Sequence, residues 1–355
     1  MRVVCLNQDP GIQPGRRKGA AVHLRAMREA FAELGAEVLA IDRSDEADVE
    51  AALRAAHAHA AVDLVYERYA LGRCAAARYC GEHGVPLVVE VNAPLADEET
   101  RYRSAAVDPA AGARDRELLG AAALVLAVSG DVARYAVARG ASPGRVHVRP
   151  NGVDTRRFQP RIAADPVRGR LVPAERFALG FHGRLRPWHG FELFARGAAR
   201  LLDLGEEIQL VLIGEGDFEA HLVDRVAAER VTRVGWVDHA EIGPYVASFD
   251  ALPLTYAPDA PCYFSPLKLA EAMACGVVPV LPRLGDLAAA ATDGTDAVYY
   301  RAGDLDELVS VVRGLIHDPG RRERLARAAH ATASERSWQS IAAFVLSSVA
   351  LRAQA

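Results

Sequence analysis

The stretch FALGFHGRLRPWHGFELFARGAARLLDLGEEIQLVLI, residues 177–213, contains the structural unit from which the fold follows. It has a short apolar run at 177–181, a glycine-bounded loop at 183–190, an amphipathic helical pattern near 190–203 and a second apolar run at 209–213. Continuous apolar runs of this length are typical of strands that are buried on both faces of a parallel sheet. The stretch therefore predicts a strand–helix–strand unit with parallel strands.

The same alternation of apolar runs and helical patterns continues in both directions from this unit. Ten further strands are expected at Val3–Leu6, Glu37–Ile41, Asp63–Tyr66, Pro86–Val91, Leu124–Val128, Val146–Val148, Val231–Val234, Ala251–Leu254, Val277–Leu281 and Ala297–Tyr300. Further helices are expected near 20–34, 45–59, 71–83, 129–139, 217–229, 239–248, 266–274, 304–317, 320–335 and 338–353. This pattern predicts an α/β chain with two Rossmann-like, doubly wound parallel sheets.

The alternation stops at 155–176, where prolines and arginines gather, and such a composition is typical of a linker. A chain of 355 residues is long enough for two domains. We therefore expect one Rossmann-like domain at 1–155 and a second at 156–337. In doubly wound sheets ligands bind beyond the carboxyl ends of the strands, so a cleft that both domains face is the expected site.

The composition argues against several classes of function. A formal net charge of −4 and an aromatic content of 6% argue against a nucleic-acid partner. No apolar run reaches about 18 residues, and no signal-peptide pattern follows Met1, so neither a transmembrane helix nor a signal peptide is predicted. Five cysteines without a CxxC pair indicate reduced thiols and a cytoplasmic location. Neither a DxD pair on a cleft loop nor metal-ligand spacing is present, so we expect no metal site and no obligatory metal cofactor.

The segment YFSPLKLAEAMACG, residues 263–276, contains the most informative helix. Ser265 suits the N-cap and Pro266 the first helical position, and the final glycine suits the C-cap. The N-terminus of a helix attracts phosphate through its free N–H groups and partial positive charge, and Lys268 adds a full charge in the first turn. Glu271 lies on nearly the same face, and its carboxylate can accept both hydroxyls of a ribose. A capped helix with a Lys–Glu surface pair is the alternative interpretation.

Several segments, in the order in which they occur, resemble the retaining glycosyltransferases of family four, which have the GT-B fold. The similar segments are PNGVD at 150–154, GRLRPWHG at 183–190, IGEGD at 213–217, VGWV at 234–237 and EAMACG at 271–276. The resemblance implies an acceptor-binding N-terminal domain and a C-terminal domain that binds a nucleotide diphosphate sugar. It also implies a C-terminal helix, about 338–353, that crosses back to the N-terminal domain, and sugar transfer with retention of anomeric configuration.

The helix and the resemblance together indicate a set of donor-binding residues. These are Gly19, Arg184, Gly214, Glu215, Val237, Ser265, Pro266, Leu267, Lys268 and Glu271. The chain departs from the family's usual pattern at two positions, with Tyr263 in place of a glutamate and His189 in place of a lysine. Lys268 is expected to compensate for the lost cation. The missing glutamate leaves open how the hydroxyls of the transferred sugar are held.

Arg184 follows a buried strand and is expected to be the main electrostatic catalyst. The departure of a diphosphate places negative charge on its oxygens, and a fixed guanidinium stabilises that charge through bidentate hydrogen bonds. His189 and Lys268 complete the expected catalytic set, with His189 donating to phosphate in its protonated form. A solvent-facing histidine at the start of a helix is the alternative for His189. Trp188 is expected to pack against other residues.

Three residues of the first half are candidates on the acceptor side, namely His23, Asn92 and Arg101. For His23, a helix histidine satisfied by its neighbours is at least as well supported. The acceptor is expected to be a small molecule, a glycan or a lipid. A basic group that could bind an anionic acceptor or membrane phosphates surrounds the first helix and comprises Arg16, Arg17, Lys18, Arg25 and Arg28. A solvated face is the favoured interpretation of that group.

Other functions stay open on these residues. A nucleotide-sugar epimerase or a sugar phosphorylase would use the same fold. A non-catalytic nucleotide-sugar-binding protein is a further alternative, to which the departures at Tyr263 and His189 give weight. Asp42 ends the second strand, where an NAD-dependent oxidoreductase has a ribose-binding acid, but the glycine spacing of the N-terminal loop is not GxGxxG.

Overall fold

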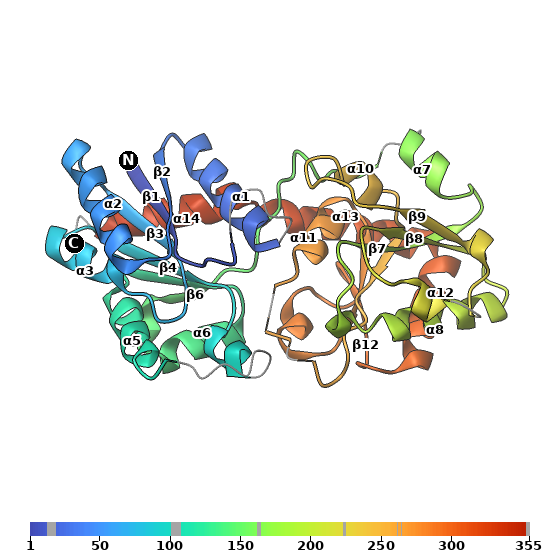
Figure 1. Cartoon of the computed structure of the whole chain (residues 1–355). Helices are drawn as coiled ribbons and strands as arrows, with labels where there is room; N and C mark the ends of the chain where they lie inside the picture. The colour runs from blue at the N-terminus through green and yellow to red at the C-terminus, as the bar shows by residue number, and fades with distance from the viewer. Residues whose placement is uncertain are drawn as a thin grey trace. The chain divides into compact units, whose positions relative to one another are not determined.

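The computed structural model describes residues 1–12, 19–100, 108–161, 165–222, 225–260, 262–263 and 265–352. The chain divides into two compact units (Figure 1). The first unit comprises Met1–Asn151 together with Trp338–Ala355, and the second comprises Gly152–Ser337. The division falls four residues before the boundary expected at 155.

The first unit is built on a six-stranded parallel sheet. Its strands are β1 (Arg2–Asn7), β2 (Glu37–Asp42), β3 (Leu64–Arg68), β4 (Leu87–Val91), β5 (Leu124–Ala127) and β6 (Val146–Val148). They lie in the order β2-β1-β3-β4-β5-β6. Its helices are α1 (Gly19–Glu33), α2 (Glu46–His59), α3 (Ala75–His83), α4 (Leu95–Glu98), α5 (Ala111–Ala121), α6 (Gly130–Ala138), the 3-10 turn η2 (Pro143–Arg145) and α14 (Trp338–Arg352).

Burial and capping explain why these segments form their elements. Every residue of β1, β4 and β5 is buried, as expected for strands that helices cover on both faces. Asp45 is the N-cap of α2, and its side chain accepts hydrogen bonds from the N–H groups of Ala47 and Asp48. Ser129 begins α6 by accepting one from Val132. Such side chains satisfy N–H groups that have no partner within the helix.

The second unit is also built on a six-stranded parallel sheet. Its strands are β7 (Phe177–His182), β8 (Ile208–Ile213), β9 (Val231–Val234), β10 (Ala251–Pro253), β11 (Val278–Pro282) and β12 (Val298–Tyr300). The order β12-β11-β10-β7-β8-β9 means that the chain reverses direction across the sheet between β7 and β10. Its helical elements are α7 (Pro166–Leu171), η3 (Pro187–His189), α8 (Phe191–Asp203), α9 (Glu219–Leu222), η4 (Ala228–Arg230), α10 (Gly243–Val246), α11 (Leu267–Ala274), η5 (Gly285–Ala289), α12 (Leu305–His317) and α13 (Pro319–Glu335).

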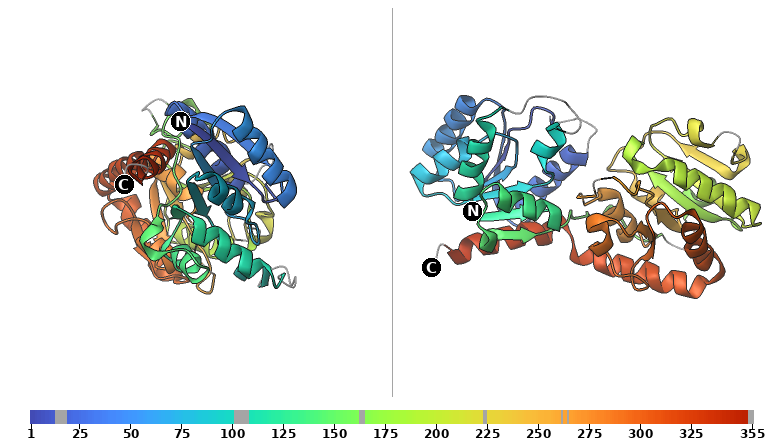
Figure 2. Two further views of the ribbon diagram at one scale, coloured as in Figure 1. Left: turned by 90° about the vertical axis from the view of Figure 1, so that its left-hand side faces the viewer. Right: turned by 90° about the horizontal axis from the view of Figure 1, so that it is seen from below.

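The last helix, α14, belongs to the first unit, as expected (Figure 2). Trp338 at its start is buried, and its ring centroid lies 4.6 Å from that of His23 in α1. The guanidinium of Arg149, the residue after β6, lies over the ring of Phe344, 4.1 Å from the ring centroid. Gln339 donates a hydrogen bond to a carboxylate of α1, at 2.6 Å. Apolar and polar contacts therefore both attach α14 to this unit.

All twelve expected strands are present, but two expected helices are wrong in extent. In place of a helix over 217–229, α9 covers only Glu219–Leu222, and Ala227 is extended (ψ 141°) before η4. In place of a helix over 239–248, α10 covers only Gly243–Val246. The proline at its second position favours this late start, because proline has no N–H to bond a carbonyl one turn earlier and therefore suits only the first turn of a helix.

The sequence analysis does not anticipate α5, because its apolar residues are few and interrupted by charged ones. In the structure, α5 is fixed to its neighbours by Asp115, which is fully buried. Its carboxylate accepts hydrogen bonds from the N–H of Gly72 at 2.9 Å and from Arg139 at 2.7 Å. Among the helices that the structure describes, none combines the length and the apolar character needed to cross a membrane.

Candidate functional site

The carboxyl ends of β7 and β10 meet at the switch point of the second sheet, where ligands of doubly wound sheets bind. The loop after β7 carries Arg184 and His189. The segment after β10 leads into α11, which carries Lys268 and Glu271. Lys268 Nζ lies 3.3 Å from His189 Nε2, so the two segments are in contact. Residues more than seventy positions apart therefore form one polar site in this unit.

The expectation that Ser265 is the N-cap of α11 is wrong. Pro266 takes that position with an extended backbone (ψ 122°), and the helix begins at Leu267. Proline fixes φ near −65°, which suits an N-cap as well as a first turn, so its identity does not locate the boundary. At the other end, Gly276 has a left-handed φ of +66° one residue after the cap, where glycine is favoured.

Glu271 is buried, and both of its carboxylate oxygens accept hydrogen bonds. His182, the last residue of β7, donates from Nε2 to Oε2 at 2.8 Å. His239, in the segment after β9, donates from Nε2 to Oε1 at 2.8 Å. Burial alone would raise the pKa of Glu271, but the two histidine hydrogen bonds outweigh it and lower the pKa to about 2. Each carboxylate oxygen can accept a second hydrogen bond, so the ionised group keeps capacity for a ligand.

Lys268 lies beside an aromatic ring and a histidine, where burial disfavours its charged form. Its ammonium nitrogen lies 4.4 Å from the ring centroid of Phe181 and close to His189. Burial lowers the pKa of Lys268 to about 7, with Glu271 opposing that shift. At neutral pH the side chain is therefore divided between its charged and uncharged forms.

The surroundings of His189 disfavour its protonated form in the free protein, and its role as a donor to phosphate stays a prediction. Burial, with the nearby charge of Lys268, lowers the pKa of His189 to about 3. Its Nδ1 accepts a hydrogen bond from the N–H of Arg186 at 3.1 Å. A neutral imidazole has one N–H, which must then be on Nε2, facing Lys268 Nζ.

Arg184 lies at the expected place after β7 and forms an ion pair with Glu215. Its Nη2 lies 2.6 Å from Glu215 Oε2, and both side chains are about half exposed. Gly214, beside Glu215, has a φ of +116°, and a Cβ there would lie 2.4 Å from the carbonyl oxygen of Gly183. Only glycine allows the two loops this close an approach. Among the expected donor-binding residues, Glu215 is thus placed to orient Arg184.

Two other expected features of this unit have different outcomes. Trp188 does not pack as expected, because 46% of it is exposed and the Arg186 guanidinium lies 5.9 Å from its ring centroid. Val237 follows β9 and packs, partly buried, against the core. Its role in donor binding stays a prediction.

Two family models together match most of the chain. The model for glycosyl transferases of group 1 matches residues 176–318. The model for glycosyltransferase family 4 matches residues 47–157. The chain belongs to the family 4, group 1 glycosyltransferases. The fold described above and both matched segments agree with the resemblance found in the sequence.

Known proteins of this group are similar along most of the glycosyltransferase. A D-inositol 3-phosphate glycosyltransferase of Thermobifida fusca is 28% identical over 305 residues, which are 81% of this chain and 69% of the relative. The crystal structure of Anabaena HepE in complex with UDP is similar with a TM-score of 0.75 and 21% identity, over 98% of this chain and 100% of that one. A sucrose-phosphate synthase of Thermosynechococcus elongatus has a TM-score of 0.73 and 18% identity, over 97% of each chain. The solved structures confirm the GT-B fold.

The acceptor-side candidates lie in the first unit of the glycosyltransferase. His23 is buried in α1, and its Nε2 lies 2.7 Å from Glu90 Oε1. Burial alone would raise the pKa of Glu90, but His23 outweighs it and holds that pKa below its usual value. This geometry favours the interpretation of His23 as a histidine satisfied by its neighbours. Asn92 follows β4, and its buried amide atoms have no partner among the residues described. Arg101 lies outside the described residues.

The remaining N-terminal candidates are also placed only in part. Gly19 is the first residue of α1, whereas Arg16, Arg17 and Lys18 lie outside the described residues. Arg28 pairs with Asp42 at 2.7 Å. The carboxylate that an oxidoreductase would direct to a ribose is therefore bound to an arginine of its own unit.

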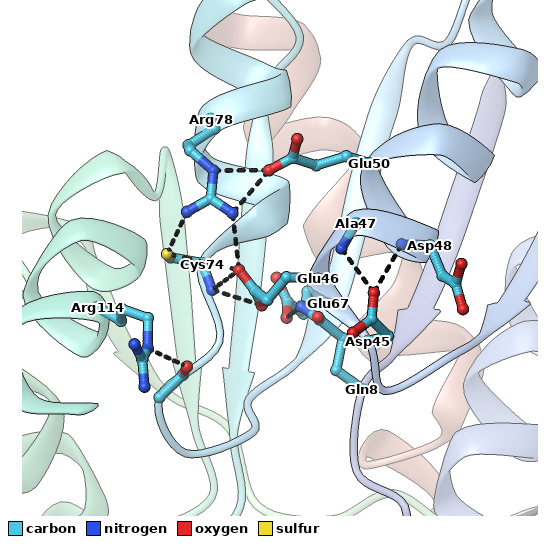
Figure 3. Close-up of polar contacts among 11 residues, drawn as sticks. Gln8, Asp45, Glu46, Ala47, Asp48, Glu50, Glu67, Cys74, Arg78 and Arg114 are labelled. Atoms are coloured by element: carbon cyan, nitrogen blue, oxygen red, sulfur yellow. Dashed lines mark hydrogen bonds and ion pairs between the residues drawn. The ribbon is translucent and has the colours of Figure 1, made fainter. Parts of the chain in front are cut away.

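A buried polar pair that the sequence patterns did not indicate lies at the carboxyl edge of the first sheet (Figure 3). Gln8, after β1, donates from Nε2 to Glu67 Oε1 in β3 at 2.7 Å. Burial raises the pKa of Glu67 to about 8, although the bond from Gln8 opposes the shift. Next to it, a buried nitrogen of Arg68 has no partner among the described residues. Gln8 directly follows β1, and Glu67 and Arg68 are the last two residues of the neighbouring strand β3, which is the signal that could have identified them.

His182 and His239 were missed as well, although both contact the most specific motif of the chain. His182 directly precedes the glycine that opens the 183–190 loop, a position at the carboxyl end of a strand. That position is a usable sequence signal. No comparable signal marks His239, because its contact with Glu271 depends on the path of the segment after β9.

Proposed function

We propose that this glycosyltransferase transfers a sugar from a nucleotide diphosphate sugar to an acceptor hydroxyl with retention of anomeric configuration. The main support for this proposal is the arrangement of Arg184, Lys268 and Glu271 in the second unit. Lys268 supplies positive charge in the first turn of α11, where a diphosphate is favoured, and Arg184 supplies it from the loop after β7, whose His189 contacts Lys268. The Glu271 carboxylate lies one turn further along the helix and suits the two hydroxyls of a ribose. The complex of Anabaena HepE with UDP supports a nucleotide donor.

In the proposed reaction, the bond between the anomeric carbon and the phosphate oxygen breaks while the acceptor oxygen attacks the same face of that carbon. The proton of the acceptor hydroxyl passes to the departing phosphate oxygen, so atoms and charge balance without a further base. Arg184 and Lys268 stabilise the negative charge that develops on the diphosphate. We propose that these cations fill this role without an obligatory metal ion.

We propose that the acceptor binds at the carboxyl edge of the first unit's sheet. The unsatisfied amide of Asn92 and the unsatisfied nitrogen of Arg68 offer hydrogen bonds there. A hydroxyl-rich small molecule, glycan or lipid headgroup would satisfy them. The name of the Thermobifida relative, a D-inositol 3-phosphate glycosyltransferase, supports an acceptor of this kind.

We propose a cytoplasmic location for the enzyme. All five cysteines, Cys5, Cys74, Cys80, Cys262 and Cys275, are buried free thiols. Free thiols are the usual state in a reducing compartment. Fractionation of the native host's cells, with detection of the protein by antibody, would test this location.

A donor and acceptor panel tests the proposed reaction. Purified protein is incubated with nucleotide sugars, with and without hydroxyl acceptors, and the release of nucleoside diphosphate is measured. We expect release only when an acceptor is present, and NMR of the product should show the anomeric configuration of the donor. Inversion would overturn retention. Conversion of the donor without an acceptor would instead favour an epimerase.

The low pKa of Lys268 predicts that donor binding is linked to proton uptake. A bound diphosphate favours the charged ammonium, whereas the free protein loses that proton as the pH rises through about 7. Donor affinity should therefore fall above pH 7, by at most about tenfold per pH unit for one proton. Calorimetry between pH 6.5 and 8.5 with a nucleotide sugar measures this directly, because its diphosphate does not titrate in that range.

Lys268→Met provides the comparison for this pH dependence. The variant has no titratable group at this position, so its donor affinity should be low and nearly constant over the same range. Arg184 stays charged throughout in both proteins. An equally steep pH dependence in Lys268→Met would assign the titration to another group and contradict the prediction.

A further inference from the structure

Each oxygen of the Glu271 carboxylate is bonded by a histidine, and the two histidines come from different parts of the chain. His182 ends β7, and His239 follows β9, 57 positions later in the sequence. Each Nε2 lies 2.8 Å from a different carboxylate oxygen. Two donors on opposite oxygens fix both the position and the plane of the group. A carboxylate on an unrestrained glutamate side chain would rotate about its terminal torsion, which has a broad energy profile.

The buried surroundings favour an uncharged imidazole at His182 beside the ionised carboxylate of Glu271. Burial lowers the pKa of His182, and this effect outweighs the opposing one of Glu271. The proton of a neutral imidazole must be on Nε2 to bond the carboxylate, so Nδ1 is an acceptor without a proton. The Nδ1 atoms of His182 and His239 are both buried and have no partner within the described part of the chain. Among the described residues, the hydrogen bond to Glu271 is therefore the polar contact that holds each ring.

The two histidines differ in how firmly the fold holds them. The side chain of His182 is 3% exposed and its ring centroid lies 6.2 Å from that of Phe249. The side chain of His239 is 23% exposed, with its ring centroid 5.3 Å from that of Phe158. His182 is therefore the fixed inner support, and His239 is the support closer to solvent. A ligand that reaches the carboxylate from solvent passes closer to His239.

We propose that His182 and His239 are positioning residues that orient the Glu271 carboxylate to accept hydrogen bonds from both hydroxyls of a ribose cis-diol. In this way the two histidines set the preference of the site for ribonucleotides over deoxyribonucleotides. This proposal rests on the proposed function, in which Glu271 faces the ribose of the donor. Each oxygen uses one hydrogen bond for a histidine and keeps one for a ligand hydroxyl. The geometry suits two adjacent hydroxyls, because a planar carboxylate presents its two oxygens side by side.

The test compares sugar discrimination with phosphate affinity. Calorimetry on the full chain measures binding of ADP, CDP, GDP and UDP, of the 2′-deoxy form of whichever binds best, and of inorganic pyrophosphate. We expect the wild type to prefer the ribonucleotide by at least about tenfold, the usual scale for losing one hydrogen bond to a charged group. In His182→Leu and in His239→Leu that ratio should fall below about threefold, while pyrophosphate affinity stays within about twofold.

Two further variants separate positioning from general damage. His182→Gln keeps an N–H donor near the position of Nε2 and should restore most of the discrimination. His317→Leu removes a histidine whose Nε2 lies 2.9 Å from Glu206 in the same unit, away from α11, and should leave the ratio unchanged. Thermal unfolding of every variant identifies a protein that has failed to fold. If His182→Leu is unfolded, the more exposed His239→Leu carries the test.

The outcomes distinguish this proposal from the one on which it rests. A wild type that binds none of the nucleotides, or binds ribo and deoxy forms equally, would overturn the assignment of Glu271 to a ribose. A wild type that discriminates, with folded leucine variants that discriminate equally well, would overturn only the role of the two histidines. Loss of discrimination with loss of pyrophosphate affinity would show a structural effect and would also contradict the positioning role.

Discussion

Replacing Arg184 with methionine is expected to lower kcat by about 10²–10³, the usual effect of removing one donor that stabilises charge in the transition state. The guanidinium lies at the carboxyl end of β7 and is oriented by Glu215 at 2.6 Å. Negative charge grows on the departing diphosphate during the reaction, so the contribution of Arg184 is larger in the transition state than in the bound donor. KM should therefore change much less than kcat. Steady-state kinetics with the donor identified by the panel measures both.

The neighbouring Arg186 provides a matched control for Arg184. It belongs to the same loop and is exposed, and its guanidinium lies over the ring of Trp188. Arg186→Met removes the same charge from the same loop and should leave kcat within about threefold. Equal losses in both variants would indicate a general field effect. A kcat within threefold of wild type in Arg184→Met would show that this arginine is not the main electrostatic catalyst.

Replacing Glu271 with alanine is expected to reduce both stability and donor affinity. The substitution leaves the N–H groups of His182 and His239 without an acceptor, and each buried donor that loses its partner costs about 1–3 kcal/mol. Loss of the hydrogen bonds to a ribose should also raise the Kd for the donor at least about a hundredfold, since bonds to a charged group contribute about 1.5–3 kcal/mol each. Denaturant unfolding and calorimetry on the folded protein measure the two effects separately.

Glu206→Ala provides a matched control for Glu271→Ala. Glu206 is also buried in the second unit and also has two partners, Arg313 at 2.7 Å and His317 at 2.9 Å. Glu206→Ala should destabilise the unit while leaving donor affinity unchanged. A Glu271→Ala protein that loses stability alone would contradict the assignment of this carboxylate to the donor.

The stability supplied by Glu271 has a defined pH window. The pKa of this group is lower in the folded protein, at about 2, than its ordinary value of 4.5. Protonation therefore favours the unfolded chain, and the stabilisation is complete above about pH 4.5 and is lost as the pH falls towards 2. The acid unfolding of Glu271→Ala should accordingly lack this contribution.

Much of the fold could be predicted from the sequence because local chemistry determines it. The buried strands are continuous apolar runs, such as that of β8, and such runs need no knowledge of their neighbours to be found. The C-terminal end of α11 could be located from Gly276, since few other residues adopt a left-handed φ at low cost. The start of the same helix could not be located to the residue, because proline suits two adjacent positions.

The candidate site was predicted in its parts and not in its contacts. Arg184, Lys268 and Glu271 were identified from their places after strands and within one helix. Their protonation states were not, because a pKa depends on burial and on neighbours that are distant in sequence. The uncharged His189, the lysine that titrates near neutrality and the two histidines on Glu271 all arise from such neighbours.

By itself, the sequence determined the two Rossmann-like units, the order of their elements and the motif residues at the ends of the strands. These features depend on residue type and spacing along the chain, which local patterns record. Only the tertiary structure decided which polar groups meet at the switch point of the second sheet and which of them carry charge. Hydrogen bonds and desolvation act between side chains that folding brings together, so His182 and His239 acquire their relation to Glu271 only when β7, β9 and α11 have assembled.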